Sequence, residues 1–242
     1  MIYDLTQIND ELDMLEIRLN ILDPYVDFFV IGQSTQTFSG KDKVLHFNSY
    51  EKRWDKWRDK MINVIMPRVE TDDVFERTAI QKDSLRTALV DCKPDDVIYY
   101  GDVDEIWIPK GEEGKLRQLN HCYHLNQRSS EDWQGTNRVL YKNIVNLNEL
   151  RANHDNVIEN GGWHFTNCGG IDKLRSKVES YDHQEMINDD VRERLEERME
   201  NGEDYLGRSR DWQGKPFEYW IDELDLPSYL LDNKSKWLHL FK

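Results

Sequence analysis

The first hundred residues alternate between helical and strand patterns, and this alternation restricts the fold more than any other feature of the sequence. Leucines at helical spacing end at Pro24, and the apolar run at residues 26–31 predicts a strand that is buried on both faces. Helical patterns at 50–66 and from 72 or 73 to about 91 precede a second predicted strand at 97–100. Because helices between strands connect parallel neighbours, we predict the α/β class, with a central, mostly parallel mixed sheet flanked by helices.

Beyond residue 110, short strand patterns and charged helices replace this alternation. We predict strands at 121–126 and 137–141, with a polar loop between them that carries Trp133. Helices are predicted at 171–180 and 189–201.

No linker, repeat or low-complexity segment divides the sequence, so we predict one domain over residues 1–242. The 38% of hydrophobic residues suffices for one core at this length. The tail from residue 220 carries leucines around Pro227, and we expect it to pack on that core.

Charge and cysteine content exclude several classes of function. The formal net charge of −15, with no basic block, argues against a nucleic-acid partner. Three widely spaced cysteines, Cys92, Cys122 and Cys168, form neither a metal-ligand pair nor a disulfide set, which favours a reducing, cytoplasmic compartment. No signal peptide is visible and no apolar run approaches the roughly 20 residues of a membrane span, so we expect a soluble protein.

Two aspartates one residue apart follow the predicted strand at 97–100. If the strand continues, Asp102 and Asp104 lie about 7 Å apart on one side, and Glu105 points to the other. Such carboxylates suit Mg²⁺ or Mn²⁺, which in turn bind phosphate oxygens. An acidic turn after a buried strand is the alternative. The crevice of a parallel sheet lies beyond the carboxyl ends of its strands, and this position favours the metal site.

Seven segments, in order and reaching to about Arg208, resemble the glycosyltransferases of family 17, the β-1,4-mannosyl-glycoprotein N-acetylglucosaminyltransferases that add bisecting GlcNAc. The segments are residues 10–19, Thr37-Phe38-Ser39-Gly40-Lys41, Glu76-Arg77 with Gln81, Asp102-Val103-Asp104-Glu105-Ile106, Trp133-Gln134-Gly135-Thr136, Gly161-Gly162-Trp163-His164-Phe165 and Ser180-Tyr181-Asp182-His183-Gln184-Glu185.

The resemblance implies a GT-A type nucleotide-sugar fold with a nucleotide-binding half at 1–110 and an acceptor half with a C-terminal tail at 111–242. It also implies a UDP-sugar donor, UDP-GlcNAc first among them, held by Mn²⁺ or Mg²⁺, and inverting transfer to a sugar hydroxyl. Two departures matter. Gln33-Ser34 stands where family members usually carry Glu before Ser, and the membrane anchor of the animal relatives is not seen. The chain resembles a compact microbial or viral version, for which a protein N-glycan acceptor is not implied.

A third metal ligand and a catalytic base complete the site that the resemblance implies. His164 is the candidate third ligand, with His183 as its rival; the alternative for His164 is a hydrogen-bonded core histidine. Inverting transfer needs a carboxylate to take the acceptor's proton. Glu185 is the first candidate and Asp182 the second, although Glu185 could simply open the next helix.

Several polar residues are candidates for contacts with the nucleotide. Thr37, Gly40 and Lys43 lie in a predicted loop after a strand, where glycine allows close approach and lysine neutralises phosphate. Arg77 and Gln81 share one helical face. A plain surface loop and a solvated helix face are the respective alternatives.

Glu16 and Arg18 interrupt an otherwise apolar helix, either as a structural ion pair or as nucleotide contacts. Trp133, with Gly135 beside it, and Trp163 could stack on sugar rings or belong to the core.

The sequence thus predicts a metal-dependent inverting glycosyltransferase that moves GlcNAc or a related sugar from UDP to a glycan or glycolipid hydroxyl. A non-catalytic carbohydrate-binding or assembly protein on the same fold is the alternative, and Gln33 is its only support. A phosphohydrolase with Asp102 as nucleophile is disfavoured, because that chemistry expects its first aspartate on an early strand.

Overall fold

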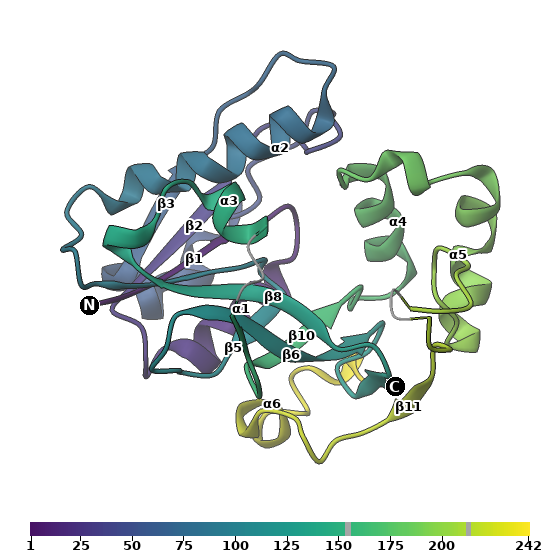
Figure 1. Cartoon of the computed structure of the whole chain (residues 1–242). Coiled ribbons are helices and arrows are strands. Elements are labelled where there is room, and N and C mark those ends of the chain that lie inside the picture. The colour runs from purple at the N-terminus through teal and green to yellow at the C-terminus, as the bar shows by residue number, and fades with distance from the viewer. Residues whose placement is uncertain (153–155, 212–213) are drawn as a thin grey trace.

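The protein is described by a computed structural model that covers residues 1–152, 156–211 and 214–242, without the side chains of 49–51 (Figure 1). Its strands form one mixed sheet in the order β11-β7-β6-β8-β4-β1-β2-β3; β9 and β10 also pair with β6, and β5 pairs with β10. Helices flank this sheet, so the predicted α/β class is confirmed. The parallel pairs lie mainly within the first hundred residues, and most later pairs are antiparallel.

The parallel part consists of β1 (Ile2–Gln7), β2 (Phe28–Gln33), β3 (Met61–Ile65) and β4 (Val97–Tyr100), with β1 at its centre between β2 and β4. β1 is not recognisable from the sequence, because the buried polar residue Asp4 interrupts its apolar pattern.

The helix predicted at 50–66 is wrong. A 3-10 helix, η1 (Asn48–Lys60), occupies most of this segment, and β3 follows it directly. Trp54 and Trp57 are buried three residues apart, which matches the three-residue period of a 3-10 helix. The β-branched Ile62 and Val64 favour the strand.

Helical elements cover the two faces of the parallel part. On one face, Leu15 and Leu19 of α1 (Leu12–Leu22) pack in one apolar cluster with Phe29 and Ile31. On the other face, η2 (Ser84–Leu89) follows α2 (Val74–Asp83) and packs in a cluster with Val30. Alternate residues of β2 therefore face opposite layers, as the pleat of a strand requires.

The second half adds β6 (Gly114–Cys122), β8 (Trp133–Leu140) and β10 (Gly162–Thr166). The polar loop predicted around Trp133 is wrong, since Trp133 to Thr136 form the first half of β8. The helices predicted at 171–180 and 189–201 are confirmed as α4 (Ile171–Ser180) and α5 (Asp189–Asn201), which lie to the side of the sheet in Figure 1.

The remaining elements are α3 (Leu147–Ala152), α6 (Ser228–Asp232), β5 (Glu105–Trp107), β7 (Gln127–Ser129), β9 (Val157–Ile158), β11 (Tyr219–Ile221) and the 3-10 helices η3 (Tyr141–Asn143), η4 (Gln184–Met186) and η5 (Leu238–Leu240). The tail packs on the core as expected, through buried Leu226, Leu230, Trp237 and Leu240, while Leu224 is exposed. Across the described ranges, no helix combines the length and apolarity that a bilayer span requires.

One buried histidine makes stability depend on pH. His121 in β6 is fully buried; burial, helped by the charge of Arg128, lowers the pKa of its ring from 6.5 to about 4. Below pH 6.5 the unfolded chain binds a proton there that the folded chain does not. The neutral His121 ring therefore favours the folded state fully above pH 6.5, and this stabilisation is lost as the pH falls towards 4.

Between pH 7 and about 4.5, we expect the free energy of unfolding of the wild type to fall by on the order of 2–3 kcal/mol more than that of His121→Leu. Urea unfolding at each pH measures both. The substitution itself changes packing, so the comparison is between the two pH slopes. If the free energy of unfolding fell equally with pH in the two proteins, His121 would not be the source of the pH dependence.

Candidate functional site

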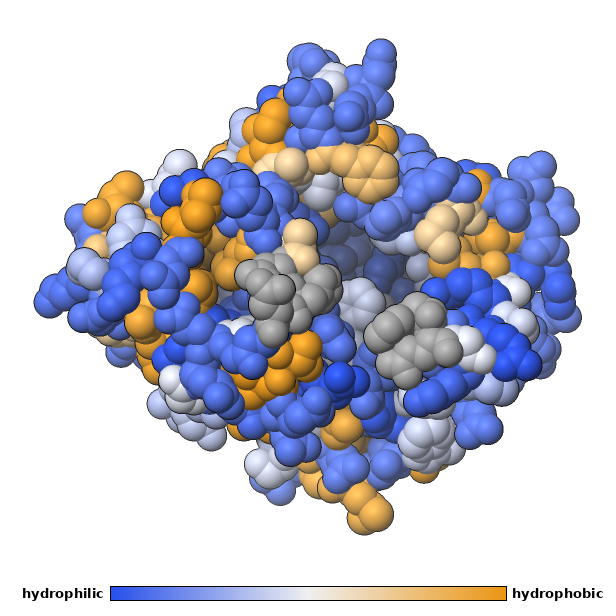
Figure 2. All heavy atoms as spheres, in the orientation of Figure 1, coloured by the Kyte–Doolittle hydropathy of each residue, from blue (hydrophilic) through white to orange (hydrophobic). Residues whose placement is uncertain are grey.

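A cavity of about 1000 Å³ opens beyond the carboxyl ends of the parallel strands. Gln7 at the end of β1, Gln36 after β2, Met66 after β3 and Asp102 after β4 all line it. Figure 2 shows this face of the molecule hollowed at its centre, with mostly hydrophilic residues around the opening. The cavity therefore occupies the place where α/β sheets bind ligands.

The two aspartates line this cavity, although not by the predicted local geometry. The strand ends at Tyr100, and a turn separates it from β5, which begins at Glu105. Strand alternation therefore does not set the directions of Asp102 and Asp104, and that part of the prediction is wrong. Both residues nevertheless line the same cavity, and Asp104 also lines a smaller neighbouring one.

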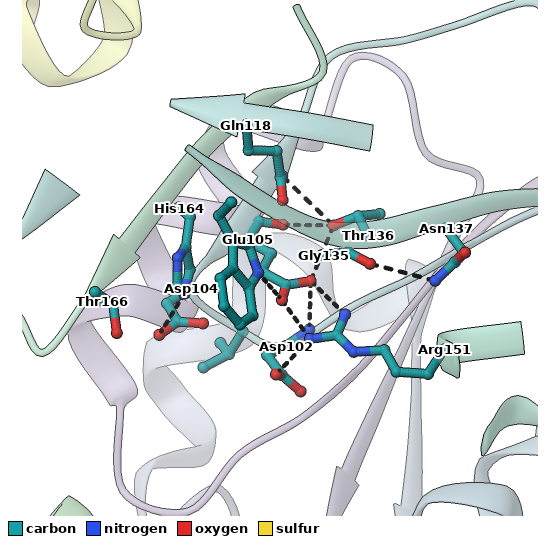
Figure 3. A network of polar contacts seen from close by, with 12 residues as sticks. Asp102, Asp104, Glu105, Gln118, Gly135, Thr136, Asn137, Arg151, His164 and Thr166 are labelled. Atoms are coloured by element: carbon teal, nitrogen blue, oxygen red, sulfur yellow. Dashed lines mark hydrogen bonds and ion pairs between the residues drawn. The ribbon is translucent and has the colours of Figure 1, made fainter. Parts of the chain in front are cut away.

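Glu105 supports the turn from below. Its side chain is fully buried, and its carboxylate accepts hydrogen bonds from the Asp102 backbone N–H (3.1 Å), Trp133 Nε1 (2.7 Å) and Arg151 Nη1 (2.7 Å). Figure 3 shows Asp102 and Arg151 beside this carboxylate. Gly135 leaves the necessary room, because a Cβ there would lie 2.3 Å from the Cδ of Glu105.

Arg18 lies beneath the same turn and not on the cavity. Its guanidinium is fully buried, pairs with Asp4 at 2.6 Å and donates to the carbonyls of Asp102 (2.9 Å) and Glu105 (2.6 Å). Of the two alternatives predicted for Arg18, a structural ion pair and a nucleotide contact, the structure shows the ion pair. Glu16 also stays away from the cavity, since its carboxylate accepts from Arg53 at 2.6 Å.

Positive charges surround the Asp102 carboxylate. Arg151 Nη2 donates to its Oδ2 at 2.7 Å, Lys82 Nζ lies 3.8 Å from its Oδ1, and Gln7 donates to the same oxygen. Burial raises the pKa of this carboxyl, but the charges of Arg151 and Lys82 outweigh that effect and hold the pKa well below its usual value. Asp102 is therefore ionised near neutral pH.

Asp104 has a separate set of partners. Its Oδ2 lies 3.6 Å from His164 Nε2 and 3.7 Å from Lys177 Nζ. Burial raises the pKa of the Asp104 carboxyl, and the neighbouring His164 and Lys177 lower it by more, so the net direction is downward. The ring of Trp133 stacks on His164 with centroids 4.6 Å apart, and both line the cavity.

The predicted metal ligands fit a divalent cation in kind. Carboxylate and imidazole donors suit Mn²⁺, and the buried Nδ1 of His164 has no hydrogen-bond partner among the described residues. Among those same residues, no three His, Cys, Asp or Glu side chains are already arranged to hold a metal. Instead, Asp102 pairs with Arg151 at 2.7 Å, and Asp104 lies 3.6 Å from His164 Nε2.

Some of the residues predicted to contact the nucleotide line the cavity, and others lie outside it. Thr37, Lys43 and Gln81 line the cavity. Burial lowers the pKa of Lys43, whose Nζ donates to the Asn9 side chain at 2.9 Å, and the buried Oε1 of Gln81 has no partner among the described residues.

Arg77 and Gly40 do not line the cavity. The Arg77 guanidinium donates to the Phe38 carbonyl at 2.9 Å and lies against Gly40, whose φ is +94°. These two residues therefore shape the loop that carries Thr37. Gln33 also lies off the cavity, since it is buried and donates to Asn48 and Asn63. The single departure that supported a non-catalytic protein thus does not touch the site.

The candidates for the catalytic base also separate. Glu185 is exposed and accepts from His183 Nδ1 at 2.8 Å, and it does not line the cavity. Asp182 and His183 do line it. Trp163 lies outside the cavity and donates to the Asp225 carbonyl.

Unlike Lys43, the cavity cations beside the two aspartates escape prediction from the sequence. Lys82, Arg151 and Lys177 come from α2, α3 and α4, which carry many exposed charges, so no local signal separates them from surface residues. The one available indication was indirect: an acidic chain needs local cations or a metal to bind a diphosphate.

Comparisons with known proteins identify the family of the chain. Among curated proteins none matches the chain significantly. The sequence profile described as Glycosyltransferase family 17 matches residues 1–242, the whole chain. The chain therefore belongs to glycosyltransferase family 17.

Proposed function

We propose that this glycosyltransferase is metal-dependent and inverting, and that it moves GlcNAc or a related sugar from UDP to a hydroxyl of a glycan or glycolipid. The observation that carries the proposal is the pair Asp102 and Asp104 on one cavity, at the carboxyl end of β4. A GT-A type arrangement, with the nucleotide on the parallel half of the sheet, accords with this position.

The nucleotide would lie over the ends of β1 and β2. Thr37, Lys43 and Gln81 offer a hydroxyl, an ammonium and an unpaired amide oxygen along that side of the cavity. Lys43 would meet phosphate oxygens, and the amide would accept a hydrogen bond from the base or ribose.

The diphosphate would lie at the turn. Lys82, Arg151 and Lys177 line the cavity around the two aspartates and would neutralise phosphate oxygens. Asp102, Asp104 and His164 would hold Mn²⁺ or Mg²⁺, which supplies stabilisation of the negative charge that develops on the departing UDP. Trp133, stacked on His164, offers an aromatic surface for the donor sugar.

Release of nucleotide from a panel of UDP- and GDP-sugars with Mn²⁺ tests the proposal. We expect slow UDP release without acceptor, fastest from UDP-GlcNAc, and at least roughly 100-fold slower release in Asp102→Asn. A protein that binds sugars without cleaving any of these donors would instead be a carbohydrate-binding protein.

A further inference from the structure

The loop before β8 and the segment that leads into β11 build another part of the cavity wall. Ser130 N–H donates to the Glu218 carbonyl at 2.9 Å, and Glu218 N–H donates to Ser130 Oγ at 3.0 Å. These bonds place Glu131, in the same loop, beside the segment that carries Phe217 and Tyr219. All three of these residues line the cavity.

The Glu131 carboxylate has no hydrogen-bond or ion-pair partner among the described residues, whereas its neighbours do. Asp132 pairs with Arg128 at 2.6 Å, and Asp204 pairs with Arg208 at 2.8 Å. A carboxylate that is half-buried and unpaired on a cavity remains available to a ligand.

The surroundings of Glu131 favour uptake of a proton. Burial raises the pKa of its carboxyl, with further upward contributions from Asp211 and Asp204, while Arg208 and His164 act in the opposite direction. A general base works best when its pKa approaches the working pH, so an upward direction suits the role.

Asp182 is the other cavity carboxylate considered for this role. The end of α4 just before it is fastened to the loop after β2, where Ser39 N–H donates to the Ser180 carbonyl at 3.2 Å. The next residue, His183, packs its ring on Phe75 of α2, with centroids 5.3 Å apart. Tyr181, however, packs against the same apolar cluster as Tyr219, so Asp182 lies near both parts of the cavity wall and is the rival that the test below separates from Glu131.

The side of Glu131 also offers an aromatic surface. The rings of Phe217 and Tyr219 are near parallel, with centroids 6.3 Å apart. Ligand sites combine such apolar walls with a few polar groups, and a sugar presents both C–H faces and hydroxyls. This wall would receive the acceptor.

We propose that Glu131 is the catalytic base for transfer and that the acceptor lies against Phe217 and Tyr219. This inference rests on the proposed function. The acceptor oxygen forms a bond to the anomeric carbon of the donor sugar. The bond from that carbon to the β-phosphate oxygen breaks, and its electron pair leaves with UDP. The hydroxyl proton passes to a Glu131 carboxylate oxygen and then to water.

The test measures hydrolysis of UDP-GlcNAc with Mn²⁺, in which water takes the acceptor's place, and UDP binding by calorimetry. Glu131→Gln should lower kcat by about 100-fold or more and leave the Kd for UDP within about twofold. The wild-type kcat should fall at acid pH, and Glu131→Gln should lack that fall. Glu218→Gln, an exposed glutamate in the adjoining segment, is the matched control and should behave as wild type.

Three results would overturn the inference and leave the proposed function standing. Glu131→Gln could hydrolyse the donor as fast as wild type, or it could lose UDP binding in parallel with kcat, which indicates a structural role. The fall of kcat at acid pH could also disappear in Asp182→Asn and persist in Glu131→Gln. A wild type that releases no UDP from any donor would overturn the proposed function itself, and the inference with it.

Discussion

Replacing Arg18 by methionine is expected to lower the free energy of unfolding by about 3–5 kcal/mol, because it leaves a buried carboxylate without its partner. Arg18 and Asp4 are both fully buried, and the guanidinium also holds the carbonyls of Asp102 and Glu105. Methionine fills a similar volume, so the loss reflects charge and hydrogen bonds more than packing. Urea unfolding followed by circular dichroism measures the change.

The double variant Asp4→Asn with Arg18→Met is the control. It removes the unpaired charge and should regain part of the loss, since the new amide oxygen can still accept from Trp107 Nε1, which donates to Asp4 Oδ1 at 2.7 Å in the wild type. A single variant less than about 1 kcal/mol below wild type would show that the pair does not hold the turn.

Gly135→Ala is expected to reduce UDP-sugar hydrolysis by about 100-fold, although residue 135 does not line the cavity. The added Cβ would lie 2.3 Å from both the Cδ of Glu105 and Trp133 Nε1, so at least one of these groups must move. Movement of Glu105 releases the Asp102 backbone N–H and the guanidinium of Arg151. Initial rates at saturating donor measure the effect.

Gly111→Ala is the matched control, because a Cβ at that position would have no neighbour within 4 Å. It should keep wild-type rates and stability. If Gly135→Ala also kept the wild-type rate, the buried support beneath the aspartates would not matter for catalysis.

The fold was predictable where one residue pattern extended through a whole element. In α5, Val191 and Leu195 are buried on one face among charged residues, so the helical period was visible. In β1, the buried Asp4 satisfies Arg18 from a distant part of the chain, so a polar residue occupied a core position that no local pattern identifies. Trp133 was assigned to a loop because its neighbours are polar, although its indole N–H bonds to Glu105 from within β8.

A position on the cavity was predictable where a short side chain follows a strand end. Asp102 and Asp104 line the cavity because the turn after β4 lies at its edge. Arg18 and Arg77 have long side chains that reach either a ligand or a backbone carbonyl, and the structure shows the carbonyls. The direction of such a side chain depends on tertiary contacts, which spacing along the sequence does not contain.

The proposed function depends on a cation that Asp102 and Asp104 hold and that binds the diphosphate of the donor. Calorimetric titration of UDP with and without Mn²⁺, on wild type and on the Asp102→Ala, Asp104→Ala double variant, tests it most directly. Mn²⁺ is expected to strengthen UDP binding to wild type by about tenfold or more, and to give no such gain in the double variant. Equal UDP affinity in all four titrations would contradict it.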